Sequence, residues 1–235
     1  MENTEQHFSR FAVYIVPGDH EHELAAFGAQ WLGWDINHGR LTNFLTVLDL
    51  PAPIQKITET PHRYGFHGTI KPPFRLAEGK HFADLHNAFL AITRAQRPLS
   101  LGRLKLEKLG SFLALTPEVP TAELSAFSAE FVTHLDEFRA PPTEAETAKR
   151  KSAGLTPRQE ELLARWGYPY VFDTFKFHMT LTGPLSEPDL AQTQAALAPV
   201  VAPLLQEPVR IQEVCLVGED HTGRFHTLTR AKIGA

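Results

Sequence analysis

The chain has 235 residues, of which 43% are hydrophobic and 21% are charged, and its formal net charge is −4. This balance is ordinary for a globular protein, and the length suits one large domain or two small lobes packed together. The negative charge argues against a broad electrostatic contact with long nucleic acid. The single cysteine, Cys215, excludes an internal disulfide and a multi-thiolate metal site, and its apolar neighbours predict that it is buried.

No segment of the sequence predicts export or membrane insertion. The N-terminal residues MENTEQHFSR lack the basic-then-apolar pattern of a secretory signal. The most apolar helical stretch, LAQTQAALAPVVAPLL, is short and is interrupted by Pro199 and Pro203. We therefore expect a cytoplasmic protein without a membrane partner.

Short β-type runs alternate with amphipathic helical runs along the first half of the chain. The first run, RFAVYIVP, is apolar, β-branched and aromatic and ends in Pro-Gly, which predicts a strand. Later segments place apolar residues at helical spacing or in β-rich runs. The expected elements are strand 10–16, helix 20–33, a strand near 65–71, helix 79–96 and two strands, 99–109 and 111–117, joined around Gly110.

The second half begins with another amphipathic run, followed by a polar segment, 140–154, that predicts an exposed connection or a short helix. Thr156, Pro157 and Gln159 form a capping-box pattern with proline at the first helical position. Because strands and helices follow no regular βαβ rhythm, we expect an α+β fold with mainly antiparallel sheets. The expected elements are helix 121–139, helix 156–167, a strand near 174–182, helix 186–205 and a hairpin over 210–233.

One short phrase occurs twice, once in each half of the sequence. HRYGFHGTIKPPF covers residues 62–74, and FKFHMTLTGPL covers residues 175–185. The chain has twelve histidines, and only His67 and His178 are followed two residues later by threonine. A lone histidine on a strand is usually a surface or hydrogen-bonded residue, but two histidines in matched contexts are a specific signal.

Each phrase is expected to form a strand whose side chains alternate between two faces. The apolar residues of each phrase then point into the core, and the polar residues share the opposite face. The polar face of the first phrase carries His67, Thr69 and Lys71. The polar face of the second phrase carries Lys176, His178 and Thr180.

Two His-x-Thr strands that meet across a cleft carry the groups needed to cleave a phosphodiester without a metal. A neutral imidazole accepts a proton from water or a hydroxyl, and a protonated imidazole donates one to the leaving oxygen. Each threonine hydroxyl can donate to a phosphoryl oxygen, and Lys71 and Lys176 can neutralise its charge. The sequence leaves open which histidine is the base and which is the acid.

The paired phrases resemble the two H-x-[ST]-x motifs of the 2H phosphoesterase superfamily, which includes RNA 2′,5′-ligase-like proteins and cyclic phosphodiesterases. Four longer strings resemble, more narrowly, a 2H branch associated with bacterial phosphonate-utilisation operons: RYGFHGTIKPPF, LGSFLAL, RKSAGLTPRQEELLARWGYPYVF and FHMTLTG. The resemblance covers nearly the whole chain. It implies one bilobal, pseudo-symmetric α+β domain over residues 1–235, with two mainly antiparallel sheets, outer helices and a central groove between the motifs.

The resemblance also implies roles for the shared residues. It implies that His67 and His178 are catalytic and that Thr69 and Thr180 bind the phosphate, with no metal and no cofactor. The operon association suggests a ribose cyclic phosphate from phosphonate breakdown as substrate, such as phosphoribosyl 1,2-cyclic phosphate.

Three further residues are candidates for substrate contacts. Tyr14 alternates with apolar neighbours on the first strand, which borders the groove in the 2H fold. Arg63 precedes the first phrase and is either a ligand for a second phosphate or a solvated charge. Arg150 belongs to a basic cluster in segment 149–158, which either covers a substrate with an extra phosphate or is a solvated helix end.

These observations favour a metal-independent cyclic phosphodiesterase that acts on a small phosphate ester. Hydrolysis of 2′,3′-cyclic nucleotides or RNA ends is the alternative reaction, and a non-catalytic binder of nucleotides or RNA ends is the alternative class. A metal-dependent hydrolase is disfavoured, because His20 and His22 are followed by none of the further His and Asp ligands of a dinuclear site. The sequence contains no phosphate-loop or dinucleotide fingerprint and is silent on oligomeric state.

Overall fold

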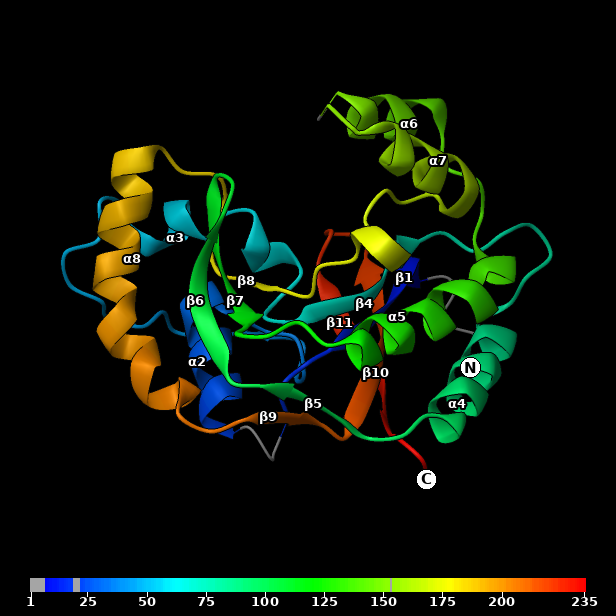
Figure 1. Ribbon diagram of the computed structural model, residues 1–235, viewed down its shortest axis with the longest axis horizontal. Coiled ribbons are helices and arrows are strands. Elements are labelled where there is room, and N and C mark those ends of the chain that lie inside the picture. Colours follow the sequence, from blue (N-terminus) through cyan, green and yellow to red (C-terminus); the bar gives the residue numbers. More distant parts are fainter. Residues whose placement is uncertain (1–6, 19–21, 153) are drawn as a thin grey trace.

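The computed structural model describes residues 7–18, 22–152 and 154–235. The described strands form one large antiparallel sheet in the order β11-β10-β1-β4-β8-β7-β6, together with two small two-stranded sheets (Figure 1). The expected α+β class with antiparallel strands is confirmed. The strands of the large sheet are β1 (Phe8–Ile15), β4 (Gly68–Phe74), β6 (Leu104–Leu109), β7 (Phe112–Pro117), β8 (Met179–Thr180), β10 (Glu213–Asp220) and β11 (Phe225–Lys232). The small sheets pair β2 (Trp34–Asp35) with β3 (Arg40–Leu41) and β5 (Leu99–Gly102) with β9 (Val209–Ile211).

The large sheet has two parts, joined where Gly68 of β4 lies opposite Met179 of β8. One part consists of β11, β10, β1 and β4, and the other consists of β8, β7 and β6. Neither part comes from one half of the sequence, because the C-terminal hairpin β10–β11 pairs with the N-terminal β1, while β8 pairs with β7. The strands of the two sequence halves are therefore interleaved in space.

The strand of the first phrase lies later in the sequence than the expected range near 65–71. β4 starts at Gly68 and continues through Pro72 and Pro73 to Phe74. Beyond Gly68, β4 is paired with β1 but has no further pair with β8. Proline cannot donate to a ladder and is tolerated at such an unpaired edge.

The strand of the second phrase is much shorter than the expected range near 174–182. β8 has only two residues, because its ladder with β7 becomes irregular after Thr180. The amides of Leu181 and Thr182 both donate to the carbonyl of Leu113. The Thr182 hydroxyl takes the place of a backbone acceptor and receives the hydrogen bond of Leu113 N at 3.0 Å.

The helices begin and end largely as the sequence predicts. The expected capping box is confirmed, since Thr156 Oγ1 accepts from Gln159 N and the Gln159 side chain accepts from Thr156 N. Helix 20–33 is observed from His22 onward, and residues 20 and 21 lie outside the described part of the chain. No helix within the described ranges is long and apolar enough to cross a membrane. The α-helices are α2 (His22–Leu32), α3 (Ile54–Ile57), α4 (Phe82–Ala95), α5 (Ala122–His134), α6 (Glu144–Lys151), α7 (Pro157–Trp166) and α8 (Glu187–Val201), and the 3-10 helices are η2 (Pro61–Arg63), η3 (Asp136–Phe138), η4 (Phe172–Thr174) and η5 (Ala202–Leu205).

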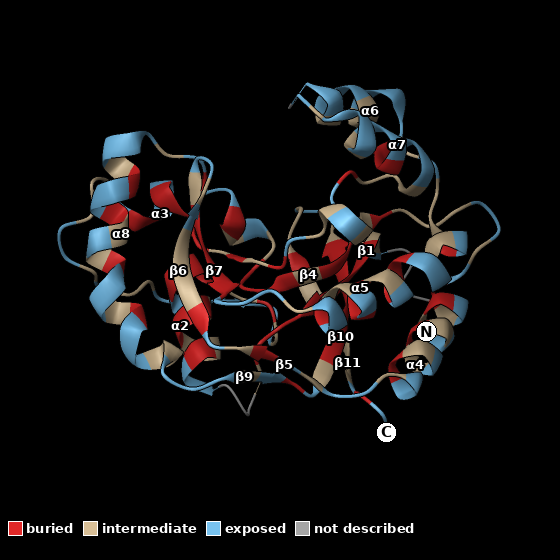
Figure 2. Ribbon diagram, viewed as in Figure 1, coloured by how far each residue is buried: buried red, intermediate tan, exposed pale blue. Residues whose placement is uncertain are grey.

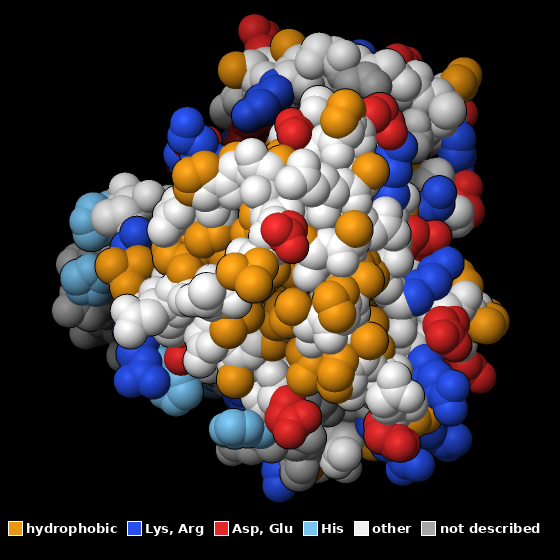
Figure 3. All heavy atoms as spheres, turned by 90° about the vertical axis from the view of Figure 1, so that its left-hand side faces the viewer, with side chains coloured by type: hydrophobic (Ala, Val, Ile, Leu, Met, Phe, Trp, Pro, Cys, Tyr) orange, Lys and Arg blue, Asp and Glu red, His pale blue; other side chains and the backbone are white. Residues whose placement is uncertain are grey.

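The two faces of the large sheet are packed differently, although Figure 2 shows that its strands are mostly buried. Successive residues of β1 point to opposite faces of the sheet. Val13 belongs to the main core, whereas Tyr14 belongs to a smaller cluster with Cys215. Cys215 is fully buried there, as expected, and burial raises the pKa of its thiol to about 11. Elsewhere, Leu41 and Leu48 are exposed, and apolar side chains gather on the surface that carries α8 (Figure 3).

The α6–α7 segment stands apart from the body of the molecule, above the β1 and β4 ribbons in Figure 1. α6 buries none of its residues. Side chains from the body hold the segment at its base: Arg75 Nη2 lies 3.2 Å from Glu146 Oε2, and Arg139 Nη2 donates to the carbonyl of Arg165 at 3.1 Å. The expected exposed connection or short helix at 140–154 is thus a helix, α6.

Candidate active site

The two H-x-T motifs lie on adjacent strands in the middle of the large sheet. Because β4 and β8 run antiparallel, His67 lies across from Thr180. Thr69 lies across from His178 in the same way. Residues that lie opposite one another in such a pair point to the same face, with Cβ atoms about 5 Å apart. The fold therefore brings the four residues of the two motifs together.

Gly68 allows the two motifs to approach closely. A Cβ atom at this position would lie 2.1 Å from Cζ of Phe177, far inside contact distance. Phe177 is buried on the core side of the second phrase. Glycine occupies the middle of the first motif because the aromatic ring that precedes His178 packs directly against its backbone.

Both catalytic candidates are held by the same local hydrogen bond. Nδ1 of His67 lies 3.0 Å from the carbonyl oxygen of Gly65, and Nδ1 of His178 lies 2.8 Å from the carbonyl oxygen of Lys176. A carbonyl oxygen can only accept, so Nδ1 carries the proton in both imidazoles. Nε2 is therefore the nitrogen that each histidine offers to a substrate.

His67 is enclosed by aromatic rings and is 7% exposed. Its imidazole stacks on Tyr14 with ring centres 3.5 Å apart, and Tyr64 meets it edge-on at 5.5 Å. Its Nε2 lies 3.1 Å from Oγ1 of Thr69. Burial lowers the pKa of His67 to about 3, against the opposing effect of the Gly65 carbonyl, so the imidazole is neutral at pH 7.

His178 lies in a more open position and contacts Phe112, with ring centres 5.8 Å apart. On β7, Leu115 pairs with Met179, so the next residue, Thr116, lies beside His178. Thr116 Oγ1 donates to Glu107 at 2.7 Å, and the pKa of Glu107 is lowered chiefly by this bond. Lys176, two residues before His178, is exposed, and its charge also lowers that pKa.

Lys71 does not share the face of His67 and Thr69, in contrast to the expectation. The register between β1 and β4 shifts by one residue between the pairs Tyr14–Thr69 and Val13–Lys71, which is the signature of a β-bulge. Lys71 therefore points to the core side, where its Nζ donates to the carbonyl of Val132 at 3.0 Å. Its ammonium is buried there and is not placed to neutralise a phosphate held by the histidines.

The remaining candidates are distributed around the motifs. The ring of Tyr14 stacks on the imidazole of His67. Arg63 is exposed at the end of η2 and forms no ion pair with a described residue. Arg150 lies on α6, where its guanidinium is 4.6 Å from the ring centre of Tyr168.

A family model described as "Protein of unknown function (DUF1045)" matches residues 69–226, well over half of the chain. The chain belongs to the DUF1045 family. The match begins at the threonine of the first motif and contains the whole second phrase. His67 lies two residues before its start.

Two curated relatives match most of the DUF1045 chain. The "Ribose 1,5-bisphosphate phosphokinase PhnN" of Janthinobacterium sp. (strain Marseille) is 35% identical over 223 residues, which cover 92% of this chain and 48% of the relative. The protein of the same name from Laribacter hongkongensis (strain HLHK9) is 30% identical over 221 residues, which cover 94% of this chain and 51% of the relative. The chain thus spans about half the length of the curated relatives that it matches.

Solved structures give more distant matches to the DUF1045 fold. A "Crystal structure of phosphoesterase" is 13% identical with a TM-score of 0.44, and E. coli LigT complexed with 3′-AMP is 13% identical with a TM-score of 0.43. Each alignment covers 97% of this chain and 99% of the other.

The described ranges of the DUF1045 chain contain no group of three or more histidine, cysteine, aspartate or glutamate side chains that could hold a metal ion. Of the H-x-H pair in the sequence, His20 lies outside the described residues.

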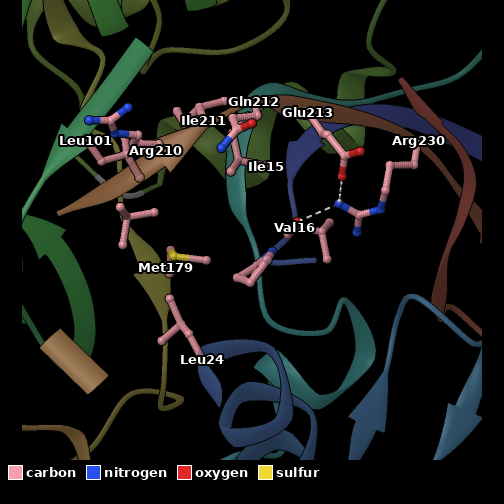
Figure 4. Close-up of a pocket in the computed structure, with 12 residues that line it drawn as sticks. Ile15, Val16, Leu24, Leu101, Met179, Arg210, Ile211, Gln212, Glu213 and Arg230 are labelled. Atoms are coloured by element: carbon pink, nitrogen blue, oxygen red, sulfur yellow. Dashed lines mark hydrogen bonds and ion pairs between the residues drawn. The ribbon is translucent and has the colours of Figure 1, made fainter. Parts of the chain in front are cut away.

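A small cavity lies on the core side of the sheet rather than at the histidines (Figure 4). Ile15, Leu24 and Met179 are among its lining residues, and its volume of about 20 Å³ is room for one water molecule. At its edge Arg230 donates to the carbonyl of Val16 at 3.0 Å. The cavity is too small for a sugar phosphate.

Several neighbours of the histidines were not identifiable from the sequence pattern. Tyr64 stands inside the first phrase, yet nothing in its spacing distinguishes it from a surface residue. Phe112 and Thr116 reach His178 only through the pairing of β7 with β8.

Proposed function

We propose that this DUF1045 protein is a metal-independent cyclic phosphodiesterase with His67 as general base and His178 as general acid. The observation that supports this most is that two imidazoles on one sheet face are held by the same hydrogen bond, which leaves both Nε2 atoms for proton exchange. Burial keeps His67 neutral at pH 7, as a base requires. The more exposed His178 is assigned as the acid.

In the proposed reaction, water attacks phosphorus in line with the departing ring oxygen. Nε2 of His67 takes a proton from the water as the new P–O bond forms, and Nε2–H of His178 gives a proton to the ring oxygen as its P–O bond breaks. The cyclic diester becomes a phosphate monoester and a free hydroxyl, and proton exchange with solvent restores both histidines. The hydroxyls of Thr69 and Thr180 donate to the non-bridging oxygens, where negative charge accumulates.

The relatives' name supports a ribose cyclic phosphate as substrate. That name refers to a phosphokinase and to ribose 1,5-bisphosphate. Hydrolysis of 5-phosphoribosyl 1,2-cyclic phosphate at the P–O2 bond leaves the phosphate on O1 and so produces ribose 1,5-bisphosphate. The kinase activity is not proposed for this chain, which spans about half of each relative and contains no phosphate-loop sequence.

Turnover measured with a chelator present tests the proposal. The substrates are 5-phosphoribosyl 1,2-cyclic phosphate and a nucleoside 2′,3′-cyclic phosphate, which presents the same five-membered ring. Wild type is compared with His67→Ala and His178→Ala, and His134→Ala, which removes an exposed histidine at the end of α5, is the matched control.

We expect chelator-resistant turnover in wild type and in the control, and its loss in both motif variants. Turnover that survives both substitutions contradicts the two-histidine assignment. Hydrolysis of the nucleotide alone would move the substrate class to 2′,3′-cyclic nucleotides or RNA ends. Binding without any hydrolysis would favour the non-catalytic alternative.

A further inference from the structure

Two tyrosines contact the imidazole of His67, and a third acts electrostatically on their phenols. Tyr14 of β1 stacks on it, and Tyr64 at the end of η2 meets it edge-on. Tyr168 follows α7 and interacts electrostatically with both phenols. Burial is the main cause that raises the pKa of Tyr64 to about 12, Tyr168 is the next cause, and Tyr168 also contributes to the raised pKa of Tyr14. These three phenols form one electrostatic group, and two of its rings contact His67.

The hydroxyls in this group have no acceptor within the described parts of the protein. Tyr14 is 2% exposed, and the pKa of Tyr168 is raised mainly by burial, yet neither hydroxyl is hydrogen-bonded to a described residue, and nor is that of Tyr64. None of the three phenol oxygens is among the described side-chain atoms that are both fully buried and unpaired, so each can be reached from solvent. The three phenols are thus available to a ligand that brings acceptors.

Arg150 of α6 adds a positive charge to the same group. Its guanidinium lies 4.6 Å from the centre of the Tyr168 ring and forms no ion pair with a described carboxylate. Arg10, whose charge also acts on the Tyr14 phenol, is by contrast held by a two-pronged contact with Glu219. Arg150 is therefore the cation of this group that remains available for a ligand.

The chemistry of the group identifies the ligand that fits it. It offers phenol O–H donors and a guanidinium that can only donate. A phosphate monoester at neutral pH has about two negative charges and three terminal oxygens that accept, which matches such a set. A neutral sugar hydroxyl or a nucleobase edge would leave the charge of Arg150 without a counterpart.

We propose that a second phosphate of the substrate, one that is not cleaved, is bound by Tyr64, Tyr168 and Arg150. The Tyr14 ring, which stacks on His67, borders this subsite. This inference rests on the proposed function, in which the reacting phosphate lies between His67 and His178. The second phosphate is a monoester on the far side of the sugar, as in a ribose cyclic phosphate with a 5-phosphate. The subsite selects this doubly phosphorylated sugar over nucleoside cyclic phosphates that carry one phosphate.

The first test compares two substrates that differ only in the second phosphate, 5-phosphoribosyl 1,2-cyclic phosphate and ribose 1,2-cyclic phosphate. In Tyr168→Phe and in Arg150→Met, the ratio of their kcat/KM values is expected to fall about tenfold or more, because each change removes a contact that only the second phosphate makes. Tyr170→Phe is the matched control, since Tyr170 is exposed and meets the Tyr168 ring edge-on. An unchanged ratio in both variants overturns the proposal.

The second test requires no turnover and separates this proposal from the reaction. By calorimetry, wild type is expected to bind ribose 5-phosphate at least about tenfold more tightly than ribose, and both variants are expected to lose this preference. If the preference is found but neither cyclic phosphate is hydrolysed, the proposed function fails and the subsite stands. If wild type binds the two sugars equally, or the variants keep the preference, the subsite is overturned whatever the protein hydrolyses.

Discussion

The first and second H-x-T motifs have the same local geometry but different surroundings. In each, Nδ1 is bound to the carbonyl two residues upstream. His67 is 7% exposed and lies against two tyrosines, whereas the more open His178 contacts Phe112 and has an exposed lysine two residues before it. Burial lowers the pKa of His67 to about 3. Two copies of one phrase thus become chemically unequal through the residues that pack on them.

This difference separates two contributions to a histidine's chemistry. The backbone conformation of the phrase sets the tautomer, since the acceptor of Nδ1–H is the carbonyl two residues away. The tertiary neighbours set the protonation state, because they decide how much water reaches the ring. A repeated motif can therefore supply a base and an acid without any change in its own residues.

The largest effects are expected from removing either imidazole. His67→Ala and His178→Ala should each lower kcat on a cyclic phosphate by about 10²–10⁴-fold. The two should differ on bis(p-nitrophenyl) phosphate, whose leaving group departs as an anion and needs no acid. There His178→Ala should recover most of its activity and His67→Ala should not, as followed by p-nitrophenolate absorbance. Recovery in His67→Ala alone would exchange the two roles.

The threonines should contribute less than the histidines. Thr69→Val and Thr180→Val keep the side-chain shape and remove the hydroxyl, so kcat/KM should fall roughly 10–100-fold through loss of a hydrogen bond to a charged oxygen. Thr69→Val should cost more, because Thr69 also lies 3.1 Å from Nε2 of His67. The serine variants retain the hydroxyl and are the controls. Equal losses in the two valine variants would contradict a special role for that contact.

The pH dependence of kcat/KM should report the burial of His67. A base must be unprotonated, so activity is lost only as pH falls through its pKa, which is about 3 here. Tyr14→Leu removes the stacked ring and admits water, which should raise that pKa toward 6.5 and move the acid limb upward by about one pH unit or more. Tyr14→Phe keeps the ring and should keep the acid limb low. A wild-type acid limb near 6.5 contradicts a buried neutral base.

The smallest effect on activity is expected at Lys71, which points away from the motifs. Burial lowers its pKa to about 8, below its usual 10.5. Between these values the unfolded chain binds more protons than the folded one, so the free energy of unfolding should rise with pH by about 1 kcal/mol per pH unit from this group. Lys71→Met should lose this rise in denaturant titrations from pH 8 to 10.5 while hydrolysis continues. A large loss of kcat would place Lys71 in the site after all.

The local sequence was sufficient to predict which motif residues share a face, but not the register and length of the strands around them. The alternation of a strand places His67 and Thr69 on one face, and the paired phrases indicate that two such faces meet. The alternation fails at Lys71, because the bulge beside it depends on the register of β4 against β1. The shortness of β8 depends on the Thr182 hydroxyl, which accepts from the Leu113 amide of β7 in place of a backbone carbonyl.

The residues around His67 could not be predicted for a similar reason. Tyr168 acts on the pKa of Tyr64 from the chain that follows α7, and the α6–α7 segment is held at its base by contacts such as Arg75 with Glu146. No spacing in the sequence relates these positions. The basic cluster at 149–158 was visible as a charge pattern, and Arg150 was a candidate within it; the fold adds that its guanidinium lies against the ring of Tyr168.

The interleaving of strands has a consequence for synthesis of the chain. β1 is synthesised long before β10, yet the two lie side by side, and Arg10 contacts Glu219 across a separation of 209 residues. Contacts this distant in sequence slow folding, and an uncovered strand edge can pair with other chains. Until the β10–β11 hairpin has been made, β1 carries one side open. During that interval β1 is exposed to pairing with the wrong strand.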